Sequence, residues 1–71
     1  MDKKEALKHG IQLLADEIGL LRGYQDAARR QGDMEELKLL EAETLRVLYC
    51  KAALHEKLRE EGLRTESPVS R

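Results

Sequence analysis

The chain has little of what usually holds a small domain together. Its 71 residues include one cysteine, one proline and two tyrosines, with no tryptophan and no phenylalanine. The single Cys50 excludes an internal disulfide framework. A chain of this length buries only about 60% of its unfolded surface, so a fold without such staples is marginally stable unless a partner completes it.

Long hydrophobic runs and an excess of charge of one sign are also missing. The first residues, Met1-Asp2-Lys3-Lys4-Glu5, are charged and lead into no unbroken apolar stretch. We therefore expect neither a signal peptide nor a membrane span, and a cytoplasmic protein. Thirteen Lys and Arg stand against 14 Asp and Glu. This balance argues against nucleic acid as a partner, because a polyanion-binding protein carries a basic surplus.

What the chain does contain is typical of long helices: it is rich in Leu, Glu, Lys, Arg and Ala. Gly32 can adopt the left-handed conformation that ends a helix, and Arg29 and Arg30 place positive charge on the turn before it. Asp33 follows as an N-cap, with Glu36 three residues later as in a capping box. One helix ends and another begins within two or three residues, which predicts an antiparallel helical hairpin.

The other helix ends carry similar signals. Asp2 and Glu5 form a second capping-box pattern, so the first helix should run from about 3 to 30. The second should run from about 34 to 61, with Gly62 as the residue that ends it.

The predicted fold is therefore all-α, a single hairpin domain over residues 1–63. Residues 64–71 show no periodicity and include Pro68, and we expect them to form a disordered tail.

Each predicted helix carries two apolar stripes that together cover roughly 200° of its circumference, about twice what packing against one neighbour needs. An isolated hairpin would leave an apolar face in water. We therefore expect a homodimer built as a four-helix bundle with coiled-coil packing, or a complex with another protein.

The stripes can be paired in two ways that fit nearly equally well. In the preferred pairing, Leu7, Ile11, Leu14, Ile18 and Leu21 meet Leu45, Leu48 and Ala52 inside the hairpin. The outer, partner-binding face is then Leu13, Leu20, Tyr24, Leu40, Val47, Leu54 and Leu58. The opposite assignment stays open.

No catalytic motif is present, and we expect no enzyme, no cofactor and no metal. His55-Glu56 resembles the start of a zinc-protease helix, but Arg59 stands where the second histidine would be. His9 and His55 should lie at similar heights, yet on different sides of their helices. Cys50 has no base nearby and is interpreted as an ordinary thiol, or one that links two copies by oxidation.

Three residues inside the apolar arcs are unusual. Gly10 has no side chain there and could admit a closely packed helix. Glu17 and Lys51 are charged residues near the centres of their arcs. We expect them to pair, either within one hairpin or across an interface between molecules; alternatively, Lys51 extends its ammonium group to solvent along its methylene groups.

The turn at Gly32-Asp33 and the second helix through Ala52-Ala53-Leu54-His55 resemble the small YscE-like co-chaperones of type III secretion needle subunits. The resemblance implies a helical hairpin that joins a tetratricopeptide-repeat protein and helps to hold the needle subunit unpolymerised in the bacterial cytoplasm. It carries no catalytic or ligand residue across to this chain.

The alternative is a self-sufficient homodimeric bundle that acts as a regulator or inhibitor by binding RNA or protein. RNA binding would need a continuous basic face, whereas Lys and Arg here are interleaved with Asp and Glu.

Overall fold

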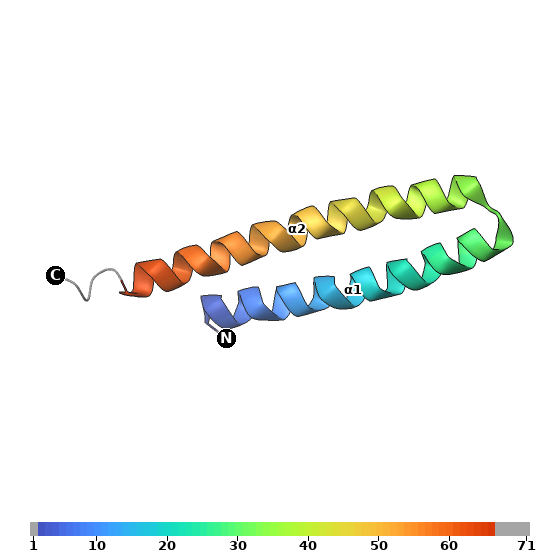
Figure 1. Ribbon diagram of the computed structural model, residues 1–71. Coiled ribbons are helices and arrows are strands. Elements are labelled where there is room, and N and C mark those ends of the chain that lie inside the picture. The colour runs from blue at the N-terminus through green and yellow to red at the C-terminus, as the bar shows by residue number, and fades with distance from the viewer. Residues whose placement is uncertain (1, 67–71) are drawn as a thin grey trace.

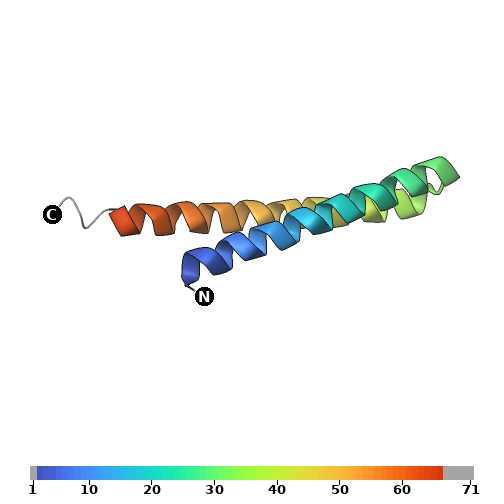
Figure 2. The ribbon, with the colours of Figure 1, turned by 90° about the horizontal axis from the view of Figure 1, so that it is seen from below.

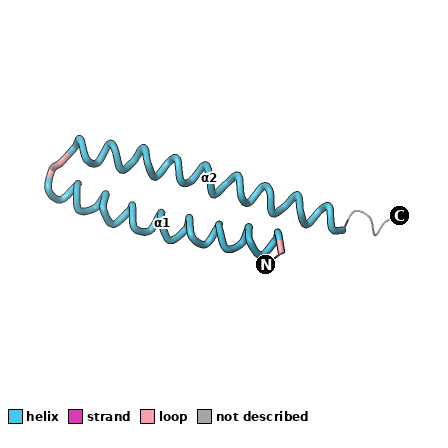
Figure 3. The backbone as a smooth tube through the Cα atoms, turned by 180° about the vertical axis from the view of Figure 1, so that it is seen from behind, coloured by secondary structure: helices cyan, strands magenta, loops and turns pink. Residues whose placement is uncertain are grey.

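The protein is an all-α helical hairpin. In a computed structural model, which describes residues 2–66, α1 spans Lys3–Gln31 and α2 spans Met34–Glu66. The two helices run side by side in opposite directions from one tight turn, and α2 continues past the start of α1 (Figures 1 and 3). They cross at a shallow angle (Figure 2), and the molecule measures 60 × 18 × 12 Å. The fold class predicted from the sequence is confirmed.

The turn follows the predicted capping chemistry. Gly32 has φ of 72°, in the left-handed region, and its N–H donates to the carbonyl oxygen of Arg29 at 3.1 Å. The Asp33 N–H donates to the Ala28 carbonyl at 2.9 Å, so the two bonds together make a Schellman motif. Asp33 also caps α2, because its Oδ1 accepts from the Glu36 N–H at 3.1 Å. Two residues thus end one helix and start the next.

The start of α1 is also as predicted, but the end of α2 is not. Asp2 Oδ1 accepts from the Glu5 N–H at 2.8 Å and caps α1. Gly62, predicted to end α2, lies inside the helix, which continues to Glu66. A glycine permits a left-handed ending without imposing one, and here its φ is not positive. Residues 64–66 are therefore helical, and the rest of the predicted tail, 67–71, lies outside the described residues.

One seam of apolar side chains holds the helices together. Its most buried members are Ile18, Leu21 and Val47, against which Leu14 and Leu40 pack. Seam positions recur three and four residues apart on both helices, as in an antiparallel coiled coil. On α1 the buried or half-buried seam residues are Leu7, Ile11, Leu14, Ile18, Leu21, Gln25 and Ala28. On α2 they are Leu37, Leu40, Thr44, Val47, Lys51, Leu54, Leu58 and Glu61.

The predicted seam of α1 is therefore correct, and that of α2 is wrong. Leu45, Leu48 and Ala52 are exposed, while Val47 is only 8% exposed. The reason lies in Thr44 and Lys51, polar residues that make the true α2 seam look less apolar than its neighbour. Thr44 satisfies its hydroxyl by hydrogen bonds within the hairpin and is 7% exposed. The fold adopts neither of the two assignments considered from the sequence: the predicted inner stripe of α1 packs against the stripe of α2 that was predicted to face outward.

Two features near the end of the hairpin that lies away from the turn allow α1 and α2 to pack closely: a glycine without a side chain and an ion pair between the helices. A Cβ placed on Gly10 would lie 3.1 Å from Leu54 Cδ1, so the absent side chain admits the facing helix as expected. Lys3 Nζ lies 3.1 Å from Glu61 Oε2, and the Glu61 side chain is mostly buried. The two helices are therefore in contact as far as the first turn of α1.

Candidate protein-binding surfaces

The structure divides the seven residues predicted to form the partner-binding face. Leu13, Leu20 and Tyr24 on α1 are 55%, 59% and 59% exposed, and we call them the α1 stripe. The other four residues belong to the hairpin seam and are buried or half-buried there: Leu40, Val47, Leu54 and Leu58. The predicted single outer face built from both helices does not exist, because the α2 half of it pairs with α1.

The α1 stripe is narrow and regularly spaced. From Leu13 to Ala27 its positions repeat at intervals of three and four, with Glu17 between Leu13 and Leu20, and Ala6 extends the line one heptad toward the start of α1. Glu17 is exposed on this line and does not pair with Lys51 of the same hairpin, so that form of the expected ion pair is wrong; a pair across an interface stays a prediction. A partner that covers the stripe must therefore supply apolar contacts on either side of one carboxylate.

A second exposed apolar surface, not predicted from the sequence, lies on α2. Leu45 is 57% exposed, Leu48 38% and Tyr49 74%, and we call these three residues the α2 patch. Ala42 and Ala52 lie beside them, one turn away on either side. The heptad spacing of Leu37, Leu40, Val47, Leu54 and Leu58, at intervals of three, four and seven residues, was the signal that Leu45 and Leu48 point elsewhere.

The α1 stripe and the α2 patch lie on opposite flanks of the hairpin. In heptad notation with the seam at a and d, the α1 stripe occupies c and g positions. Leu45 and Leu48 of the α2 patch occupy b and e positions. In an antiparallel pair the g edges of both helices border one flank and the e edges border the other. The α1 stripe and the α2 patch are therefore separate apolar surfaces.

Charged groups around these surfaces form local pairs. Lys51 Nζ lies 3.3 Å from His55 Nε2, one turn along α2, so its half-buried chain reaches out of the seam on the flank of the α2 patch. Arg46 Nη2 contacts Glu43 Oε1 at 2.8 Å, and Arg59 contacts Glu56. Hydrogen bonding and the nearby positive charge of Arg59 lower the pKa of the Glu56 carboxyl below its ordinary value of 4.5.

Within residues 2–66, no cluster of three or more His, Cys, Asp or Glu side chains is arranged to hold a metal ion. Cys50 is exposed and carries a free thiol. Neither described helix combines the length and the apolarity that crossing a membrane requires.

No known protein family matches this chain, and no curated protein and no solved structure is significantly similar to it.

Proposed function

We propose that the protein is a helical adaptor that binds another helical protein through the α1 stripe. The observation that carries the proposal is the exposure of Leu13, Leu20 and Tyr24 in one line along α1, outside a seam that is already closed. Water covers these side chains in the free hairpin, so burying them on a partner is favourable at roughly 25 cal/mol per Å² of apolar area. A hairpin with so thin a core gains stability from the same contact.

The stripe favours a helical partner with an apolar groove in which α1 can bind. Leucines and a tyrosine at helical spacing are the anchors by which an amphipathic helix enters an apolar groove. Tyrosine is also enriched among residues that dominate binding energy. Glu17 adds a requirement for a basic or hydrogen-bonding group at the centre of that groove, since an unpaired buried carboxylate is costly.

In functional terms this is the role of a small co-chaperone. It would act like the type III secretion needle co-chaperones that the chain resembles, with a tetratricopeptide-repeat protein as the helical partner. The groove between the helices of such repeats is the kind of surface that a single amphipathic helix can occupy.

Affinity capture from the native host tests the proposal. The bait is the full chain, and the variants are Leu20→Asp within the stripe and Gln12→Asp on an exposed polar position of the same helix. We expect a helical protein, identified by mass spectrometry, to be captured by the wild type and by Gln12→Asp but not by Leu20→Asp. Equal capture by both variants would exclude the α1 stripe as the binding surface.

A further inference from the structure

We propose that the α2 patch is covered by a second copy of this chain, with the two α2 helices packed antiparallel about a twofold axis level with Arg46 and Val47. This inference deepens the proposed function and rests on it for one point, the assignment of the α1 stripe to a different partner. A twofold dimer needs one surface that complements itself, and the α2 patch and its neighbours have that property.

The apolar side chains match when α2 is turned end for end. In this register Leu45 lies level with Leu48 of the second copy, and Leu48 with its Leu45, so four leucines meet at the axis. Tyr49, the most exposed of the patch residues, lies two residues, about 3 Å, from the level of Ala42 of the second copy, where a large side chain can pack against a small one. The packing of ridges into grooves favours such alternation of size.

The charges match in the same register. Lys38 lies within one residue of the level of Glu56 of the second copy, on the same edge of the helix pair. Glu41 lies within one residue of the level of Lys51 of the second copy, and the Lys51 ammonium group already reaches this flank beside His55. Both contacts occur twice by symmetry. A parallel pairing would instead set Lys38 against Lys38 and Glu41 against Glu41, which is repulsive.

The α1 stripe is a poor surface for the same purpose. Glu17 stands at its centre, so pairing two α1 stripes would place the carboxylate against Leu13, Leu20 or the other Glu17. Because the stripe and the patch lie on opposite flanks, a dimer formed through α2 leaves the stripe open. Self-association and partner binding are then independent, and the assembled adaptor presents two partner sites.

Sedimentation equilibrium with matched variants tests the surface. We expect the wild type to be a dimer at about 100 μM, since a patch smaller than a standard interface still supports micromolar affinity. Leu45→Asp should weaken dimerisation at least tenfold, whereas Leu13→Asp on the opposite flank should leave it unchanged. A monomeric wild type, a dimer dissociation constant of Leu45→Asp equal to that of the wild type, or one of Leu13→Asp raised as much as that of Leu45→Asp would overturn the proposal.

Cysteine cross-linking tests the register and does not depend on how a charged variant folds. In a Cys50→Ser background, Lys38→Cys and Glu56→Cys chains are prepared separately and then mixed under mild oxidation. The proposed register brings residue 38 within one residue of the level of residue 56 of the second copy, on the same edge of the helix pair, while two copies of residue 38 lie about 25 Å apart along the axis. We expect disulfides only between the two different variants; disulfides between like variants would overturn the antiparallel register.

Exchanging the charges of Lys38 and Glu56 tests the ion pair between the two copies by loss and recovery of dimer affinity. Lys38→Glu should weaken the dimer by opposing Glu56 of the second copy, and adding Glu56→Lys should restore it; failure of the restoration would overturn the predicted ion pair. None of these measurements involves another protein. Absence of the dimer therefore overturns this inference and leaves the proposed function standing. Failure of the affinity capture overturns the proposed function and leaves the dimer standing.

Discussion

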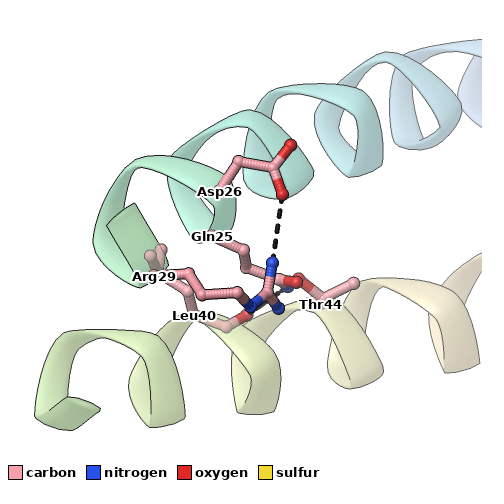
Figure 4. Close-up of polar contacts among 5 residues, drawn as sticks. All are labelled: Gln25, Asp26, Arg29, Leu40 and Thr44. Atoms are coloured by element: carbon pink, nitrogen blue, oxygen red, sulfur yellow. Dashed lines mark hydrogen bonds and ion pairs between the residues drawn. The ribbon is translucent and has the colours of Figure 1, made fainter. Parts of the chain in front are cut away.

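Gln25 on α1 donates a hydrogen bond from Nε2 to Thr44 Oγ1 on α2 at 2.6 Å, across the apolar seam of the hairpin (Figure 4). Thr44 Oγ1 in turn donates to the Leu40 carbonyl oxygen at 2.7 Å. The chain of two bonds joins the helices at one level of the seam, where a slip of either helix would leave polar groups without partners. It therefore specifies the alignment of α1 and α2 that positions both apolar surfaces.

Thr44→Val is expected to destabilise the hairpin by about 1 kcal/mol, although valine has nearly the same shape and is more apolar. The Gln25 amide would lose its 2.6 Å acceptor and keep only the Leu40 carbonyl oxygen, 3.4 Å away. Urea unfolding followed by circular dichroism measures the change. The double variant Gln25→Leu, Thr44→Val is the control, and it should recover the loss because neither polar group remains.

How far the sequence predicted this fold depends on the kind of signal each residue carries. Asp2, Gly32 and Asp33 act through local backbone chemistry, so the helix starts and the turn were predictable without knowing the partner helix. Which of the two stripes on α2 packs against α1 depends on tertiary contacts. The polar Thr44 and Lys51 make the stripe that forms the seam less apolar than its neighbour, so the sequence pattern favoured the wrong stripe. Gly62 shows the same limit, since tertiary or local context decides whether a glycine ends a helix.

How well the partner-binding residues were predicted also depended on how well the seam of each helix was predicted. Leu13, Leu20 and Tyr24 were predicted because the α1 seam beside them was correctly placed. The other predicted partner-binding residues followed from the reversed α2 assignment and lie in the seam, and the α2 patch was missed for the same reason.

Gly32→Val is expected to cost roughly 1 kcal/mol or more, because a β-branched residue is strained at a φ of 72°. Gly62→Ala is the matched control, since Gly62 lies within α2 without a positive φ and has nothing within 4 Å of an added Cβ. That variant should gain up to about 1 kcal/mol from helix propensity. Overlapping thermal melts for Gly32→Val and the wild type would contradict the observed turn.

Gly10→Ala should gain less stability than Gly19→Ala, or lose some. Both positions are helical, but an added Cβ at Gly10 lies 3.1 Å from Leu54 Cδ1, whereas nothing lies within 4 Å of one at Gly19. Gly19→Ala should therefore show the full propensity gain of about 1 kcal/mol. Combining Gly10→Ala with Leu54→Val, which removes the contact, should make the two glycine substitutions more nearly equal. Equal gains in the wild-type background would show that the helices are not close at Gly10.

The pKa of Glu56 should lie below its ordinary value of 4.5 in the folded protein, because Arg59 donates hydrogen bonds to it and carries the opposite charge. A lowered folded-state pKa means that the pair contributes stability above the ordinary pKa and loses it as the pH falls through the lowered value. Side-chain NMR titration measures the pKa directly, and Arg59→Gln should raise it. Both groups are exposed, so high salt should weaken the shift. Identical titrations of the two proteins would exclude the pair.

The division of α2 into a seam side and a patch side underlies both proposed surfaces, and two substitutions two residues apart test it. Val47 is 8% exposed and Leu45 57%, so a carboxylate is buried at the first position and hydrated at the second. The measurement is far-ultraviolet circular dichroism of Val47→Asp and Leu45→Asp under identical conditions. Our account predicts that Leu45→Asp keeps the helicity of the wild type and that Val47→Asp loses most of it. A folded Val47→Asp beside an unfolded Leu45→Asp would contradict the seam and, with it, both surfaces.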